Sequence, residues 1–145
     1  MKIGIVGFSS PQFDQETARV LLEKKLTKII TDMDKSSIEI VSGYTNIGVP
    51  KIAYEIADIM GLKTIGFSAK KALSANCGLY PVNKAIIYGK SYGDESLAFV
   101  DYIDILIRIG GGKQSRKEVQ LFKEKNEAQD LSKLLFEEEV EWYGK

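Results

Sequence analysis

The sequence has no histidine and a single cysteine, Cys77, among its 145 residues. One cysteine excludes an intramolecular disulfide and agrees with a reducing compartment. A zinc site needs several Cys or His ligands, and Ser-His-Asp or Cys-His catalysis needs an imidazole, so these chemistries are excluded. We therefore interpret Cys77 as non-catalytic and predict no metal site.

The chain also lacks net charge, because 20 basic residues balance 20 acidic ones. A general nucleic-acid-binding protein needs a basic surplus to neutralise phosphates, so nucleic acid is not an expected partner. A local basic patch is the exception to consider, and its residues are Lys113, Arg116, Lys117, Lys123 and Lys125.

Long apolar runs are missing as well. No stretch approaches the roughly 20 apolar residues needed to span a bilayer. The N-terminal segment MKIGIVGFSS lacks the longer apolar region and the cleavage site of a signal peptide. We therefore expect a cytoplasmic protein with no membrane partner.

Short apolar runs alternate with amphipathic segments along the chain. The length and the 44% apolar content fit one domain, residues 1–145. The alternation predicts an α/β fold, a Rossmann-like three-layer α/β/α arrangement with a mostly parallel five- to six-stranded sheet. The expected strands are Lys2–Phe8, Ser37–Ser42, Lys63–Phe67, Asn83–Tyr88 and Tyr102–Ile109. The expected helices are Asp14–Met33, Pro50–Met60, a short one ending near Asp101, and Gln114–Lys125, with Asp14 as an N-cap and Gly61 as a C-cap.

The C-terminal tail permits two interpretations. Residues Ala128–Phe136 have a helical pattern, and Glu139–Tyr143 alternates polar and apolar residues. The second segment is either an edge strand or a continuation of the helix. Its aromatic side chains, Trp142 and Tyr143, either cover a partner surface or pack on the chain's own sheet.

Glycine and serine gather where the predicted strands end. In an open parallel sheet, ligands bind outside these carboxyl ends. Glycine lets backbone N–H groups approach an anion, and helix N-termini add positive charge. The candidate ligand-binding residues are Gly7, Ser9, Ser10, Ser42, Gly43, Thr45, Asn46, Gly48, Ser68, Gly89, Asp94, Gly110, Gly111, Gly112, Lys113, Gln114 and Ser115.

The segment Gly110–Ser115 is the strongest of these candidates. Three glycines follow an apolar strand and precede a helix, which is the arrangement of a phosphate cradle. The segment matches neither the Walker A pattern nor GxGxxG, and a plain tight turn is the alternative. Glu118 follows in the same helix, either facing the pocket as a catalytic or ribose-binding carboxylate or forming a capping box with Ser115.

Three further acids have a structural and a functional interpretation. Asp94 and Glu95 are adjacent in a glycine-containing loop, where they would bind ribose or a metal, or cap the following helix. Asp104 interrupts an apolar strand, and we expect it to accept a structural hydrogen bond from a nearby segment.

Three segments together resemble the LOG/lysine-decarboxylase-like superfamily, which takes in the molybdenum-cofactor carrier proteins. They are SGYTNIGVPKIAYEIA, KTIGFSAKK and FVDYIDILIRIGGGKQSRKEV. LOG enzymes release a free base from a nucleoside 5′-monophosphate with the signature Pro-Gly-Gly-x-Gly-Thr-x-x-Glu. The matching residues here are Gly111, Gly112 and Glu118, with Gln114-Ser115 in place of Gly-Thr and with Gly43 and Gly48 as a second glycine loop. The family also has an arginine, which is missing in this sequence; the matching position is about Glu95.

The resemblance implies a protein that binds a nucleotide or related phosphorylated small molecule, and the acid in place of the family's arginine argues against LOG activity. No cofactor is required, although a nucleotide is a possible bound ligand. One alternative is a nucleotide N-glycosidase (phosphoribohydrolase) that uses Glu118, with Glu95 assisting. Another is an interaction protein without a ligand. Related proteins associate, so the resemblance also implies a homo-oligomer.

Overall fold

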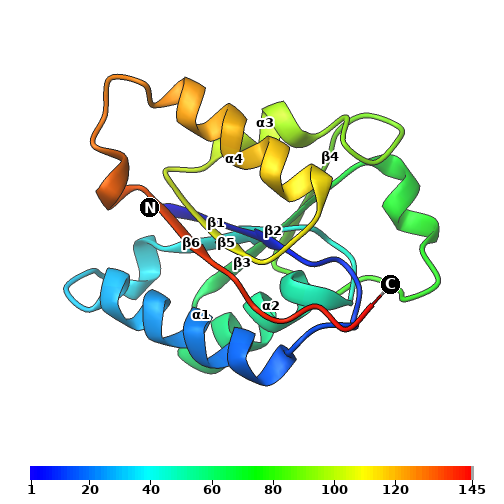
Figure 1. Ribbon diagram of the computed structural model, residues 1–145, viewed down its shortest axis with the longest axis horizontal. Coiled ribbons are helices and arrows are strands. Elements are labelled where there is room, and N and C mark those ends of the chain that lie inside the picture. The colour runs from blue at the N-terminus through cyan, green and yellow to red at the C-terminus, as the bar shows by residue number, and fades with distance from the viewer. Residues whose placement is uncertain (145) are drawn as a thin grey trace.

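Six strands and four α-helices alternate in the computed structural model, which describes residues 1–144 (Figure 1). The predicted α/β Rossmann-like fold is confirmed. The strands are β1 (Lys2–Gly7), β2 (Glu39–Ser42), β3 (Lys63–Ser68), β4 (Lys84–Ile87), β5 (Ile105–Ile109) and β6 (Leu135–Glu138). The helices are α1 (Gln15–Ile30), α2 (Gly48–Met60), α3 (Ser96–Tyr102) and α4 (Lys113–Lys125), with short 3-10 turns at Lys35–Ser37, Lys70–Ser74 and Leu131–Lys133.

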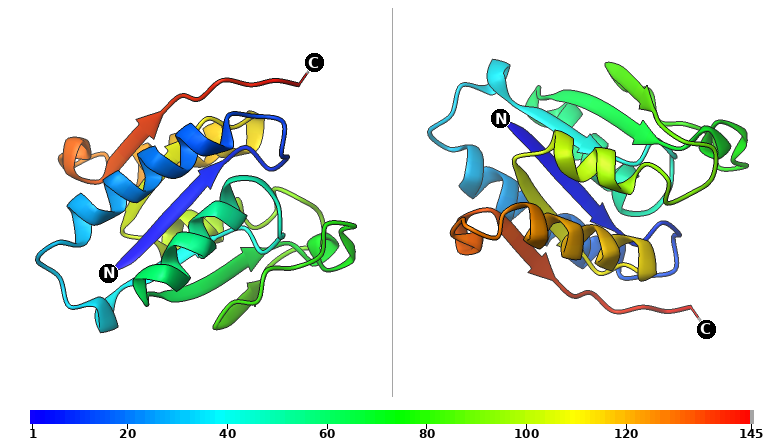
Figure 2. Two further views of the ribbon diagram at one scale, coloured as in Figure 1. Left: turned by 90° about the horizontal axis from the view of Figure 1, so that it is seen from below. Right: turned by 90° about the horizontal axis from the view of Figure 1, so that it is seen from above.

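The sheet separates two apolar cores, and Figure 2 shows helices on both of its faces. Helices α1 and α2 cover one face, where residues such as Leu22 and Ile52 pack against Ile5. Helices α3 and α4 cover the other, where residues such as Phe122 pack against Leu106. Both faces of the central strands are therefore buried, which explains why most of their residues are apolar.

The strand order β4-β3-β2-β1-β5-β6 places the topological switch between β1 and β5. All neighbouring strands are parallel, and Gly7 at the end of β1 pairs with Ile109 at the end of β5. The carboxyl ends of the strands therefore meet at one edge of the sheet. A ligand site is expected in the crevice at the switch.

Several local predictions are confirmed. The Asp14 side chain accepts from the backbone N–H of Thr17 and caps α1. Gly61 ends α2 in the left-handed conformation, at φ 73°. The prediction that a strand begins at Tyr102 is wrong, because Tyr102 is the last residue of α3. Asp104 lies before β5 and accepts from the N–H of Lys2 at 2.8 Å, the structural role expected of it.

Both interpretations of the tail are wrong in position. The strand is Leu135–Glu138, which begins in the last two residues of the segment predicted as helix, and it extends the sheet beside β5. Residues 139–143 are neither strand nor helix, and Trp142 forms an isolated bridge with Phe13. The Trp142 ring stacks on Phe8 with centroids 4.8 Å apart, so the tail packs on its own chain.

Among the described residues, no helix combines the length and apolar character needed to cross a membrane.

Candidate functional site

A cavity of about 450 Å³ lies at the carboxyl edge of the sheet. Its walls come from the ends of β1, β2 and β3, from the segment before α3, and from the first turns of α4. Twelve residues predicted from the sequence line it: Gly7, Ser9, Ser42, Gly43, Thr45, Ser68, Glu95, Gly112, Lys113, Gln114, Ser115 and Glu118. Folding thus brings together residues that are more than one hundred positions apart in the chain.

Seven candidate residues lie outside this lining. They are Ser10, Asn46, Gly48, Gly89, Asp94, Gly110 and Gly111. Asp94 does not cap α3, because its carboxylate accepts the N–H groups of Lys90 and Ser91 within its own loop. Gly89 allows that loop to close, since a Cβ there would lie 2.3 Å from the Cβ of Asp94. These two residues shape a loop beside the cavity.

The N-terminus of α4 opens onto the cavity. The N–H groups of Lys113, Gln114 and Ser115 lack intrahelical acceptors, as at the start of any α-helix, and the N-cap Gly112 has no side chain that could accept from them. The Ser115 hydroxyl donates to the carbonyl of Gly112 at 3.0 Å. A Cβ added at Gly112 would meet nothing within 4 Å. This helix end therefore presents unpaired backbone donors and positive dipole charge to open space.

The first two glycines of the triplet have a different role from the third. Gly110 and Gly111 have φ angles of 57° and 103°, which side-chain-bearing residues rarely adopt. A Cβ at Gly110 would lie 2.3 Å from the ring of Phe8. One at Gly111 would lie 2.1 Å from the Ser115 hydroxyl oxygen. These two glycines form the turn after β5, and this turn places Gly112 at the wall of the cavity.

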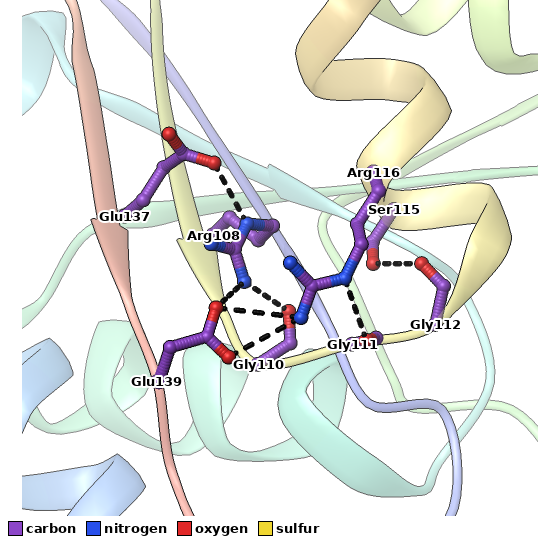
Figure 3. Close-up of polar contacts among 8 residues, drawn as sticks. All are labelled: Arg108, Gly110, Gly111, Gly112, Ser115, Arg116, Glu137 and Glu139. Carbon is purple, nitrogen blue, oxygen red and sulfur yellow. Dashed lines mark hydrogen bonds and ion pairs between the residues drawn. The ribbon is translucent and has the colours of Figure 1, made fainter.

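Two arginines, Arg108 and Arg116, donate hydrogen bonds to the carbonyl groups of this turn, as Figure 3 shows. Arg108 of β5 is only 5% exposed and donates to the carbonyl of Gly110 at 2.8 Å. It also pairs with Glu137 at 2.9 Å and with Glu139 at 2.7 Å, which ties the tail to the turn. Arg116 donates to the carbonyl of Gly111 at 3.3 Å and pairs with the same Glu139. Sequence reasoning missed Arg108, although a cation inside an apolar strand was a signal for it.

The second glycine loop leads to a closed helix end. Gly48 has φ 68°, and a Cβ there would lie 2.2 Å from the carbonyl oxygen of Phe8. That carbonyl accepts the N–H of Val49 at 2.8 Å, and Pro50 has no N–H to offer. The N-terminus of α2 is therefore taken up by backbone packing, although Gly43 and Thr45 still line the cavity.

Two buried carboxylates lie in the cavity wall. Glu95 is 5% exposed; its Oε1 accepts from Gln114 at 2.8 Å and from the N–H of Gly93 at 3.2 Å. The other oxygen, Oε2, is buried without a partner. Oε2 of Glu118 accepts from the Ser96 hydroxyl at 2.9 Å. The prediction of a Ser115–Glu118 capping box is therefore wrong, because both side chains bond elsewhere.

Desolvation decides the protonation of Glu118. Burial raises the pKa of this carboxyl from 4.5 to about 7, and the nearby charge of Glu95 acts in the same direction. The hydrogen bond from Ser96 acts in the opposite direction, because it favours the charged form. Near neutral pH Glu118 can therefore hold or release a proton, which is the property of a general acid or base.

The sequence did not point to the apolar part of the wall. Phe67, Phe99 and Tyr92 line the cavity, and the Phe67 and Phe99 rings meet edge to face with centroids 5.9 Å apart. The hydroxyls of Ser42 and Ser115 donate to backbone carbonyls, so they are engaged with the protein rather than free to donate to a ligand. Among the described residues, no group of three or more His, Cys, Asp or Glu side chains has a metal-binding arrangement.

Comparisons with known proteins support the fold. No family model matches the sequence, and no curated relative matches it. The molybdenum cofactor carrier protein of Chlamydomonas reinhardtii has a similar structure, with a TM-score of 0.67 and 18% identity over 94% of this chain and 88% of that chain. The structural-genomics protein TM1055 has a TM-score of 0.62 and 14% identity over 95% and 91% of the two chains. At these identities the comparisons establish a shared Rossmann-like fold.

Proposed function

We propose that this protein binds a nucleotide or a related phosphorylated small molecule in the cavity, with the phosphate at the N-terminus of α4. The observation that carries the proposal is the open helix end at Gly112. Backbone N–H groups of Lys113, Gln114 and Ser115 have no intrahelical acceptor there. An anion at a helix N-terminus gains both these donors and the helix dipole.

Charge and size agree with such a ligand. Lys113 lines the cavity and adds a cation beside the helix end. The cavity of about 450 Å³ lies within the range of about 300 to 1,000 Å³ that is usual for small-molecule sites. The similar structure named as a molybdenum cofactor carrier supports the binding of a small molecule by this fold.

Glu95 and Glu118 limit where the phosphate is placed. A fully ionised pair of buried carboxylates would repel an anion, but the raised pKa of Glu118 allows one of them to carry a proton. The phosphate therefore belongs at the helix end beside Lys113, and the uncharged part of the ligand belongs deeper, against Phe67 and Phe99.

Thermal unfolding with inorganic phosphate, AMP and GMP tests this proposal. A ligand at about one hundred times its Kd stabilises the folded state by about 2.7 kcal/mol, enough to raise Tm measurably. Replacing Lys113 by Glu is expected to abolish the rise. Lys123→Glu, the same change on an exposed later turn of α4, is expected to preserve it. If no phosphorylated compound raises Tm, the proposal is wrong, and an interaction protein without a ligand is favoured.

One observation favours a second candidate, hydrolysis of the N-glycosidic bond of a nucleotide. Glu118 is buried in the cavity wall with a pKa of about 7, so it can donate a proton to a departing base. Incubation with AMP, GMP and their deoxy forms, followed by detection of free base, tests this candidate. Glu118→Gln is expected to stop base release while leaving the Tm shift by inorganic phosphate in place, and unchanged turnover would exclude the role.

Self-association is the remaining expectation of the family resemblance. In the tail, the ring of Trp142 stacks on Phe8 of the same chain, but Trp142 and Tyr143 remain 41% and 61% exposed. Exposed apolar side chains also lie at and after the edge strand β4, at Ile87 and Tyr88. Light scattering coupled to gel filtration measures whether the chain is a monomer or an oligomer.

A further inference from the structure

The pair Glu95–Glu118 has no cationic partner in the part of the chain that the structure describes. Both side chains are at least 94% buried and line the cavity, and neither takes part in an ion pair. A buried carboxylate oxygen without a hydrogen bond is costly. Oε2 of Glu95 nevertheless has no partner, so this oxygen of a cavity-lining residue keeps an acceptor position that the described residues do not fill.

The orientation of Glu95 is set by its other oxygen. Oε1 accepts from both the Gln114 side chain and the backbone N–H of Gly93. These two donors hold the carboxylate in one orientation and leave Oε2 as an acceptor. Gln114 belongs to the first turn of α4, so the same turn that would hold the phosphate also orients this acid.

The surroundings of the two acids indicate the kind of donor. Phe67, Phe99 and Tyr92 line the same cavity, and Phe99 is only 3% exposed. Aromatic walls favour a flat apolar ring over a hydrated cation, which would keep its water. A heteroaromatic ring with N–H groups on its edge satisfies both the walls and the acids.

Resting on the nucleotide binding proposed above, we propose that the acid pair recognises the base, and that the base is guanine. The guanine edge presents a ring N–H beside an exocyclic NH2, two adjacent donors, one for Oε2 of Glu95 and one for the carboxylate of Glu118. Adenine presents an acceptor at the ring position, which an ionised carboxylate repels. Hypoxanthine keeps the ring N–H and lacks the NH2.

Titration calorimetry with GMP, IMP and AMP on the unaltered chain tests the base preference. GMP is expected to bind about tenfold more tightly than IMP, because loss of one donor leaves a buried acceptor unpaired, and more tightly again than AMP. Equal affinities for the three nucleotides would overturn the guanine assignment and leave nucleotide binding intact. No binding of any of them would overturn both proposals.

Glu95→Gln tests the residue assignment. Gln114 and Gly93 would hold the carbonyl oxygen of the new amide in the place of Oε1, so its NH2 would occupy the place of Oε2. A donor would then face the guanine donors, and the preference is expected to reverse in favour of AMP.

Glu124→Gln, the same change on an exposed turn of α4, is expected to keep the GMP preference. A GMP preference that survives in Glu95→Gln would overturn the role of Glu95. The comparison of three nucleotides on the unaltered chain decides the proposal even if this variant does not fold.

Discussion

Helices α2 and α4 both begin after a glycine-containing loop at the carboxyl edge of the sheet, but only α4 has an open N-terminus. At α2, Val49 donates to the carbonyl of Phe8 and Pro50 lacks an N–H. At α4, Gly112 faces open space and the first turn keeps its donors. The same residue pattern thus produces close backbone packing in one place and a candidate anion site in the other.

The difference continues into the second turn of each helix. The sixth residue of α2 is Ala53, which is fully buried in the core. The sixth residue of α4 is Glu118, which lines the cavity and has a raised pKa. Helix α2 therefore serves the packing of the sheet, whereas α4 combines packing with a polar face toward the cavity. Four substitutions test this comparison.

The largest effect is expected from Gly48→Ala at the closed end. An alanine there combines an unfavourable positive φ with a Cβ that would lie 2.2 Å from the Phe8 carbonyl oxygen. We expect the free energy of unfolding to fall by about 3 kcal/mol or more. Urea denaturation measures it. A fall below about 1 kcal/mol would mean that this helix end is not closed by packing.

Glu118→Gln tests the charge at the open end. An acid whose pKa is higher in the folded state than in the unfolded state destabilises the fold when it ionises, so stability falls as pH rises from 4.5 to about 7. At about 1.4 kcal/mol per pH unit, this interval corresponds to roughly 3 kcal/mol. The variant is expected to be more stable than the parent at pH 8 and to lose this pH dependence.

Urea denaturation of both proteins between pH 4.5 and pH 8 provides the measurement. Glu124→Gln, on an exposed turn of the same helix, serves as the control and is expected to follow the parent. Parallel stability curves for the parent and Glu118→Gln would show that Glu118 does not titrate in this range.

Arg108→Met tests the support behind the open end. The guanidinium of Arg108 is buried between the Gly110 carbonyl, Glu137 and Glu139. The two carboxylates are partly exposed and recover water when the arginine is removed, so we expect a loss of about 2 kcal/mol rather than the full cost of a broken buried pair. Arg19→Met, which removes a half-exposed pair with Glu55, is expected to cost less than about 1 kcal/mol. Similar losses for both variants would mean that Arg108 does not hold the turn.

The fold was predictable because its strands are buried on both faces. Lys2–Gly7 and Ile105–Ile109 are mostly apolar runs whose neighbours are amphipathic helices, and this local pattern suffices for an α/β assignment. The tail was not predictable in this way. Strand β6 pairs with β5, and Glu137 of β6 accepts from Arg108 of β5, a contact between residues 29 positions apart that no local sequence pattern reveals.

In the candidate site, too, residues set by the local sequence were predictable, and residues set by long-range packing were not. Gly112 and Glu118 were predictable because the glycine triplet and the following helix are contiguous in the sequence. Phe99 and Arg108 were missed because the place of Phe99 in the cavity wall and that of Arg108 beside the glycine turn depend on how α3 and β5 pack. Gly48 was predicted as a ligand residue because a glycine pattern does not reveal whether a carbonyl, here that of Phe8, already occupies the space.

Gly112→Ala is expected to have the smallest effect on stability and to separate the two helix ends most directly. Gly112 has φ −101°, and a Cβ there meets nothing within 4 Å, so the free energy of unfolding should change by less than about 1 kcal/mol. The added methyl group would project into the open space at the end of α4 and hinder the approach of a phosphate. We expect nucleotide affinity to fall about tenfold, a loss of about 1.4 kcal/mol, measured by titration calorimetry.

Gly61→Ala, at the far end of α2 with φ 73°, is the matched control, because it should lower stability and leave affinity unchanged. Unchanged affinity in Gly112→Ala would place the phosphate elsewhere and remove the functional distinction between the two helix ends.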